Sequence, residues 1–223
     1  SVDIPERVHE FSTQFKSEKL HFEFISNGVF GFIAHEAVER FDKIKLDRNK
    51  TGMDIPDMYY AVYKNVIAIS LFNHEAYLFS NTYDNDHNLD EIENLLNSQI
   101  STPFKFEKVG KKSSNLSDSE FIDFVKKGKE HCYRGDVFQL VLSRQFSQQF
   151  KGDEFNVYRT LRSINPSPYL FFFDYGYFKI FGSSPEAQLI VENGKAEIHP
   201  IAGTFRRTGN DPKDTQAAKE LAK

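Results

Sequence analysis

A run of short apolar stretches separated by turn signals constrains the fold of this chain most strongly. Three stretches are rich in aromatic and β-branched residues and predict consecutive strands: residues 169–173, 177–181 and 187–192. Asn193 and Gly194 then form a two-residue turn that tolerates positive φ, so residues 195–199 return beside the third strand. Such short connections join antiparallel strands. The pattern therefore predicts an α+β fold with mainly antiparallel sheets and helices packed outside them, and not alternating βαβ units.

Helical spacing of apolar residues predicts the remaining framework. Helices are expected over residues 1–15, 36–41, 88–100, 117–134, 155–163 and 214–223. Further strands are expected over residues 20–24, 59–70, 75–80 and 137–146, with 59–70 and 75–80 forming a hairpin. Ser117 and Glu120 have the spacing of a capping box, in which each satisfies a free N–H of the other. Residues 101–115 lack periodicity and are interpreted as a linker, which gives an N-terminal region over 1–115 and a second region over 116–223.

Composition narrows the class of protein. The 39% hydrophobic content and 23 Phe suffice for a substantial core. The net charge of −4 and the lack of a long Lys/Arg block argue against a nucleic-acid-binding protein. No apolar run approaches the roughly 18 residues of a membrane span. The single Cys132 excludes an internal disulfide and fits a reducing compartment, so we expect a soluble cytoplasmic protein.

The segment from His199 to Arg207 has the residues of an anion-binding loop. Gly203 lacks a Cβ and so lets a ligand approach the main chain, while Thr204 offers a hydroxyl. Arg206 and Arg207 supply forked donors for carboxylates or phosphates. The local pattern alone favours a strand end followed by a solvated basic turn.

Four ordered blocks change that interpretation. Residues 200–204 read Pro-Ile-Ala-Gly-Thr, 165–171 read Asn-Pro-Ser-Pro-Tyr-Leu-Phe, and 181–186 read Phe-Gly-Ser-Ser-Pro-Glu. The fourth block begins with Gly-Asp-Val-Phe-Gln at 135–139 and ends with Ser-Arg at 143–144. All four resemble, in order and spacing, the motifs of the anthranilate synthase component I family of chorismate-utilising enzymes. The dense similarity covers about residues 117–208, and a weaker one covers 22–83.

The resemblance implies a lyase that converts chorismate and ammonia to anthranilate and pyruvate in tryptophan biosynthesis. In family terms, Gly203 and Thr204 match the residues that contact chorismate. The family's catalytic His and the two Glu that bind Mg²⁺ lie in its C-terminal half, and nothing up to Lys223 matches them. We therefore expect an incomplete chorismate-utilising fold, with no catalytic or metal-binding residue in this chain, that is inactive alone.

The resemblance also implies two partners. A glutamine amidotransferase subunit would supply ammonia, and tryptophan would bind as a feedback inhibitor. Pro168, Tyr169 and Leu170 match the family residues that line the tryptophan site, with Leu170 in place of the family's Met. The other half of that site, a Leu-Leu-Glu-Ser motif, is not found in this chain.

Two other functions stay open at this point. Typical aminodeoxychorismate synthases carry Lys where this chain has Ala202, because the amine attacks the ring; alanine is consistent with direct attack by ammonia. A non-catalytic amino-acid-sensing module on the same fold is the alternative of another class. Weaker patterns carry no assignment: Glu39 stands where a zinc motif starting at His35 needs a second His, and Lys105 stands where a phosphate-binding loop needs Gly.

Overall fold

The computed structural model describes residues 4–16, 18, 22, 24–47, 53–84, 86–98, 105–201 and 206–221. The chain divides into two compact units, Ser1–Thr102 and Pro103–Lys223. None of the helices in the described ranges is both long enough and apolar enough to cross a membrane.

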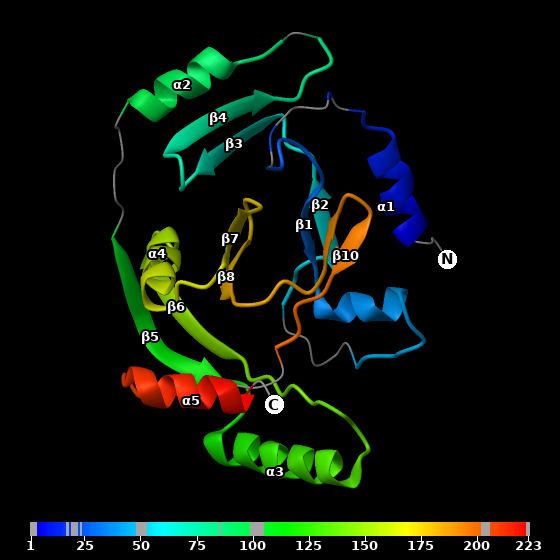
Figure 1. Ribbon diagram of the computed structural model, residues 1–223, viewed down its shortest axis with the longest axis vertical. Coiled ribbons are helices and arrows are strands. Elements are labelled where there is room, and N and C mark those ends of the chain that lie inside the picture. Colours follow the sequence, from blue (N-terminus) through cyan, green and yellow to red (C-terminus); the bar gives the residue numbers. More distant parts are fainter. Residues whose placement is uncertain are drawn as a thin grey trace. The chain divides into compact units, whose positions relative to one another are not determined.

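The first unit combines short antiparallel pairs with three helical segments (Figure 1). Its elements are α1 Ile4–Thr13, β1 Phe30–Ile33, the 3₁₀ helix η1 His35–Arg40, β2 Met58–Ala61, β3 Asn65–Ser70, β4 Glu75–Ser80 and α2 Leu89–Asn97. β3 and β4 form the predicted hairpin, with Asn65 opposite Ser80. The expected strand over 59–70 is in fact two strands, because residues 62–64 interrupt it and β2 pairs with β1 instead.

Four aromatic rings form an apolar cluster in the described part of the first unit. Phe22 and Phe24 stack with their centroids 5.0 Å apart, and both contact Tyr77 and Phe79 of β4 at 5.0–5.9 Å. The expected strand over 20–24 lies largely outside the described residues; Phe22 and Phe24 themselves are not in a strand. Their rings nevertheless cover one side of the β3–β4 hairpin, which alone would be only marginally stable.

The second unit contains three antiparallel pairs and three helices. Its elements are β5 Phe106–Ser114, α3 Asp118–Arg134, β6 Phe146–Gly152, α4 Phe155–Ile164, β7 Tyr169–Asp174, β8 Lys179–Ser184, β9 Ile190–Glu192, β10 Lys195–Glu197 and α5 Asp211–Leu221. β9 and β10 are joined by the predicted turn, in which Asn193 has φ 50° and Gly194 has φ 76°. Every strand pair in the described chain is antiparallel, which confirms the predicted fold class.

Two predictions for the second unit are wrong. Residues 106–114, expected within a linker, form β5 and pair with β6, where Phe106 and Phe150 stack at 5.3 Å. Charged and small residues such as Lys111 and Ser113 hid this strand because its side chains are mostly exposed. Conversely, residues 137–145, expected in a long strand, have no strand partner among the described residues, and β6 begins only at Phe146.

The boundaries of α3 follow directly from the sequence. Its N-terminal cap is the predicted capping box: the backbone N–H of Glu120 donates to Ser117 Oγ, and the Ser117 N–H donates to the Glu120 carboxylate at 2.8 Å. The Ser117 N–H and the Ser117 hydroxyl both donate to this carboxylate and lower the pKa of Glu120, because they favour the ionised form. At the other end Gly135 adopts a left-handed φ of 78°, and helix α3 ends there.

Candidate functional site

The loop between α4 and β7 is held in place by an aromatic layer. Phe155 and Tyr158 of α4 contact Phe172 of β7 at 5.0 and 5.4 Å between ring centroids. Phe172 in turn stacks on Phe181 of β8 at 5.5 Å, and the two residues are cross-strand partners. Aromatic pairs of this kind contribute about 0.5–1.5 kcal/mol each beyond their buried area. The layer therefore fixes α4 against the β7–β8 hairpin and defines where residues 165–168 run.

An ion pair lies at the end of this aromatic layer that is farther from the loop. Lys179 of β8 contacts both the Glu154 carboxylate at the start of α4 and Asp174 Oδ2, the latter at 3.4 Å. The hydrogen bond with Lys179 lowers the pKa of Glu154, and the same bond raises the pKa of Lys179. Both side chains are less than a third exposed, so solvent screens this pair less than a fully exposed one.

Asn165 forms the corner between α4 and the loop. Ser183 of β8 donates its hydroxyl to the Asn165 carbonyl oxygen at 2.6 Å, and the Ser167 N–H donates to the same oxygen at 2.9 Å. Ser183 belongs to the Phe-Gly-Ser-Ser-Pro-Glu block and Asn165 to the Asn-Pro-Ser-Pro block, so the two motifs meet here. The sequence argument quoted both motifs and missed this contact, since only the register of the hairpin brings them together.

The three residues expected to contact tryptophan follow this corner. Pro168 is exposed, Tyr169 is 43% exposed and Leu170 is half-buried. Tyr169 and Leu170 are the first two residues of β7, opposite Ser184 and Ser183. Because side chains alternate along a strand, Leu170 lies on the face that carries Phe172 and Tyr169 lies on the opposite face. The structure thus gives a rigid backbone with one side chain on each side of it.

The packing around Gly182 explains why the Phe-Gly-Ser-Ser-Pro-Glu block has a glycine at its second position. A Cβ at this position would lie 2.6 Å from Cζ of Phe171, its cross-strand partner. The Phe171 ring therefore covers the main chain of β8 and needs a residue without a side chain there. This contact adds a second constraint on the segment that begins at Pro168.

Gly203 and Thr204, the expected chorismate contacts, lie outside the described residues, as does Ala202. The described chain shows the two ends that flank them. On one side the β9–β10 hairpin leads to His199, Pro200 and Ile201, which are all exposed. On the other side Arg206 and Arg207 precede α5 and are also exposed.

A compact polar turn fixes the chain just after the two arginines. Asp214 of α5 accepts hydrogen bonds from the Thr208 N–H and the Thr208 hydroxyl, each at 2.8 Å, and from the Gly209 N–H at 3.3 Å. These bonds, together with the positive charge of Arg207, lower the pKa of Asp214. The turn therefore sets where the segment with the two arginines joins α5.

Within the described ranges, no group of three or more His, Cys, Asp or Glu side chains is arranged to hold a metal ion. His199 Nε2 lies 3.7 Å from a carboxylate oxygen of Glu197 at the exposed end of β10, a position that fits a surface contact. The described residues therefore form no arrangement that fits a magnesium ion.

Three comparisons with known proteins bear on this chain. A sequence profile described as chorismate binding enzyme matches residues 3–223. Anthranilate synthase component 1 of Aquifex aeolicus is 45% identical over 108 residues, which is 48% of this chain and 22% of that protein. Component 1 of Methanothermobacter thermautotrophicus is 31% identical over 217 residues, covering 97% of this chain and 45% of that protein.

A solved structure shows the same fold. The crystal structure of anthranilate synthase component I from Streptococcus pneumoniae superposes with a TM-score of 0.69 at 24% identity, covering 98% of this chain and 49% of that one. The chain therefore spans about half the length, or less, of the relatives it matches.

Proposed function

The chain belongs to the family of chorismate-binding enzymes, and from this membership we propose that it is a portion of an anthranilate synthase component 1. The proposed reaction joins chorismate and ammonia and releases anthranilate and pyruvate, a step of tryptophan biosynthesis. The observation that carries the proposal is the family match over residues 3–223. The relatives cited above, with 31–45% identity, bear that same name.

Gly203 and Thr204 are the proposed contacts for chorismate. Support comes from the sequence, in which a residue without a Cβ stands beside a hydroxyl and close to Arg206 and Arg207. A bare main-chain N–H, a hydroxyl and two guanidinium groups can each hydrogen-bond a carboxylate, and chorismate carries two carboxylates. Fixed donors of this kind stabilise charge that develops on a leaving oxygen.

Ala202 favours ammonia as the nucleophile. A lysine amine at this position would attack the substrate itself, and a methyl group cannot. The amine would then come from ammonia that a glutamine amidotransferase partner releases. The runner-up, an aminodeoxychorismate synthase component, is distinguished by its product. The amino-acid-sensing module has no observation in its favour beyond the shared fold.

Magnesium and the catalytic His are proposed to belong to a part of the longer protein outside residues 1–223. When bound, the ion would act as a Lewis acid that assists loss of the hydroxyl group. Over the residues that the structure describes, no group of three or more His, Cys, Asp or Glu side chains is arranged to hold this ion. The proposed location of the enzyme is the cytoplasm, in keeping with the single Cys132.

An assay of the longer protein tests the catalytic proposal. With chorismate, ammonia and Mg²⁺ the longer protein should form anthranilate, detected by fluorescence and mass, whereas residues 1–223 alone should form none. Gly203→Val should lower kcat/KM by about a hundredfold, because a branched side chain blocks approach to the main chain. Ala196→Val, at an exposed position of β10, is the matched control and should stay near wild type. Turnover by residues 1–223 alone would refute the proposal that the catalytic groups lie outside this chain. An aminated product other than anthranilate would refute the proposed reaction.

Tryptophan is proposed to bind at Pro168, Tyr169 and Leu170. Pro168 fixes φ near −65° and the Asn165 corner holds the preceding residues, so a ligand meets a backbone that needs little ordering. The ligand can touch the main chain and one of the two side chains, because Tyr169 and Leu170 lie on opposite faces.

Calorimetry with the longer protein tests this site. Tryptophan should bind with measurable heat, and Ser183→Ala should weaken binding about threefold to tenfold, because one hydrogen bond worth ~1 kcal/mol no longer holds the corner. Ser163→Ala removes a comparable hydroxyl on α4 that bonds only the Arg159 carbonyl, and should have no effect. No heat on adding tryptophan to the wild-type protein would discredit the assignment.

A further inference from the structure

Residues 136–145 run back along α3 and are fastened at both ends. At the C-terminal end of the helix the Asp136 N–H donates to the His131 carbonyl at 3.0 Å. The Asp136 carboxylate accepts from Arg134 Nη2 at 2.7 Å and lies 2.8 Å from His131 Nδ1. These contacts lower the pKa of Asp136, with the bond to His131 as the largest cause.

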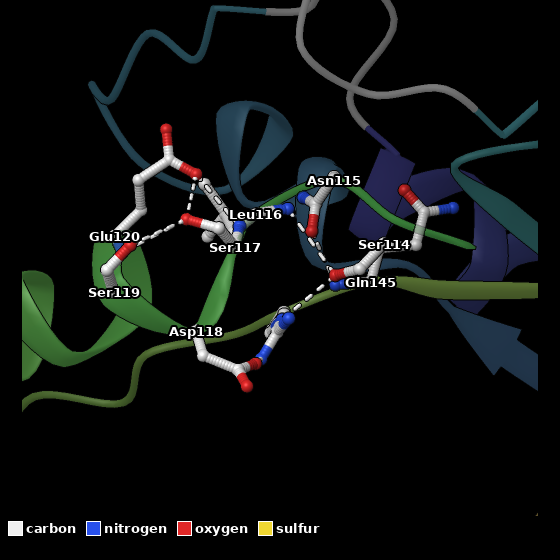
Figure 2. Close-up of polar contacts among 9 residues, drawn as sticks. Ser114, Asn115, Leu116, Ser117, Asp118, Ser119, Glu120 and Gln145 are labelled. Carbon is white, nitrogen blue, oxygen red and sulfur yellow. Dashed lines mark hydrogen bonds and ion pairs between the residues drawn. The ribbon is translucent and has the colours of Figure 1, made fainter. Parts of the chain in front are cut away.

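The second fastening lies at the N-terminal end of α3. Gln145 and Asn115 are bonded twice: the Gln145 N–H donates to Asn115 Oδ1 at 2.9 Å, and the Asn115 N–H donates to the Gln145 carbonyl at 3.2 Å (Figure 2). Arg144 donates from Nη1 to Asp118 at 2.7 Å and from Nε to Ser114 at 2.8 Å. Its side chain is only 17% exposed, and its hydrogen bonds link β5 to α3.

The distance between the two fastenings stretches the segment nearly to full extension. α3 has 17 residues and rises about 25 Å at ~1.5 Å per residue. The chain from Asp136 to Gln145 covers that length again, at roughly 2.8 Å per residue, close to the ~3.3 Å of a β-strand. Figure 1 shows the chain returning in this way from the end of α3 to β6. After a bend at Phe138 the backbone is therefore strand-like as far as Gln145, although it has no strand partner among the described residues.

From Leu140 to Leu142 the side chains alternate as they do in a strand. Leu140 and Leu142 face α3, where a Cβ on Gly128 would lie 3.0 Å from Leu140 Cδ2 and 3.7 Å from Leu142 Cδ1. Val141, between them, points the other way and is 82% exposed. Phe138, which is completely exposed, lies at a bend before this alternation begins.

The main chain of the segment lacks partners. No backbone hydrogen bond joins residues 137–144 to any other residue in the part of the chain that the structure describes. Natural sheets protect such open edges with charged residues or proline, yet residues 137–143 read Val-Phe-Gln-Leu-Val-Leu-Ser. An extended, uncharged backbone held at both ends is a template for an added strand.

We propose that residues 137–144 form an edge strand that pairs with a β-strand from the part of the longer protein outside residues 1–223. The proposal rests on the proposed function in one respect, because it takes this chain to be a portion of a longer component 1. The occupant follows from length: the chain covers 45% and 49% of two relatives that it matches along almost its whole length. The added strand should carry an apolar side chain that covers Val141, which is 82% exposed.

Hydrogen exchange on the longer protein, without chorismate, tests the pairing. Amides of residues 137–144 in the longer protein should exchange at least a hundredfold more slowly than the same amides in an unstructured peptide of that sequence. Val141→Pro should remove that protection, because proline lacks the donor and does not fit a paired strand, and Val141→Thr is the matched control that should keep it. Exchange of these amides at the rate of the unstructured peptide in the wild-type longer protein would overturn the proposal, and this wild-type measurement stands even if the proline variant does not fold.

A photo-crosslinker identifies the occupant. Benzoylphenylalanine in place of Phe138 should crosslink to a peptide from outside residues 1–223 within the same molecule. A crosslink between two copies, or to a peptide within 1–223, would contradict the proposal. Neither measurement uses catalysis, so a longer protein that forms no anthranilate but protects this strand would refute the proposed reaction alone.

Discussion

The layer of α4 on β7–β8 and the helix α3 with its return segment are held together by different interactions. In the first, rings from helix and sheet interleave, and a partly buried ion pair closes one end. In the second, polar clasps fasten the two ends of an extended segment whose main chain stays unpaired. The first region positions the proposed tryptophan contacts by packing that the chain supplies itself, whereas the second is prepared for a strand that it does not supply.

Replacing a glycine by alanine should change the stability of the two regions in different directions. Gly182→Ala places a Cβ 2.6 Å from Cζ and 2.9 Å from Cε1 of Phe171, so the whole ring must shift, and we expect a destabilisation of about 1–3 kcal/mol. Gly128→Ala places a Cβ 3.0 Å from the end of Leu140, which is 45% exposed and free to turn aside. Since alanine is favoured over glycine inside a helix, that change should be neutral or stabilise by up to ~1 kcal/mol.

Urea unfolding of the longer protein, with hydrogen exchange at β7–β8 and α3, measures both changes. The comparison fails if Gly128→Ala destabilises as much as Gly182→Ala, because Leu140 would then be no freer to move away from the added Cβ than Phe171 is.

Local signals predicted the elements that carry their own chemistry. The Asn193-Gly194 turn and the capping box at Ser117 are confirmed, and the helix expected to end at residue 134 does end there, followed by the left-handed Gly135. A few adjacent residues determine each of these features. β5 was missed because most of its side chains are charged or small and follow no apolar alternation, and because it pairs with a strand over thirty residues away. Residues 137–145 have the composition of a strand, but no strand pairs with them among the described residues, and the chain bends at Phe138.

The motifs of the site could be predicted from the sequence, but the contacts between them could not. The Asn-Pro-Ser-Pro and Phe-Gly-Ser-Ser-Pro-Glu blocks could be read from the sequence, but the hydrogen bond from Ser183 to Asn165 depends on hairpin register. The placement of Tyr169 and Leu170 on opposite faces follows from the point at which β7 begins, which periodicity alone fixes only to within a few residues. The predictions for Gly203 and Thr204 stay predictions, since these residues lie outside the described part of the chain.

As the pH falls, amides of the α3 region should lose protection from hydrogen exchange before those of the aromatic layer. We expect this effect to be smaller than that of the glycine substitutions. The pKa values of Glu120 and Asp136 are lowered by hydrogen bonds at the two ends of α3. A carboxyl whose folded pKa is depressed contributes stability above its unfolded pKa, near 4, and loses it as pH falls through the folded value. Between about pH 4 and pH 2, amides of Gly135 and Gln145 should therefore lose protection while those of Phe172 and Phe181 keep theirs, because ring packing does not titrate. Glu154 lies in the same pH window, but its pair with Lys179 only closes one end of the layer. The variant with both Glu120→Gln and Asp136→Asn should lack this acid step, and an unchanged step in that variant would show that other groups control the loosening.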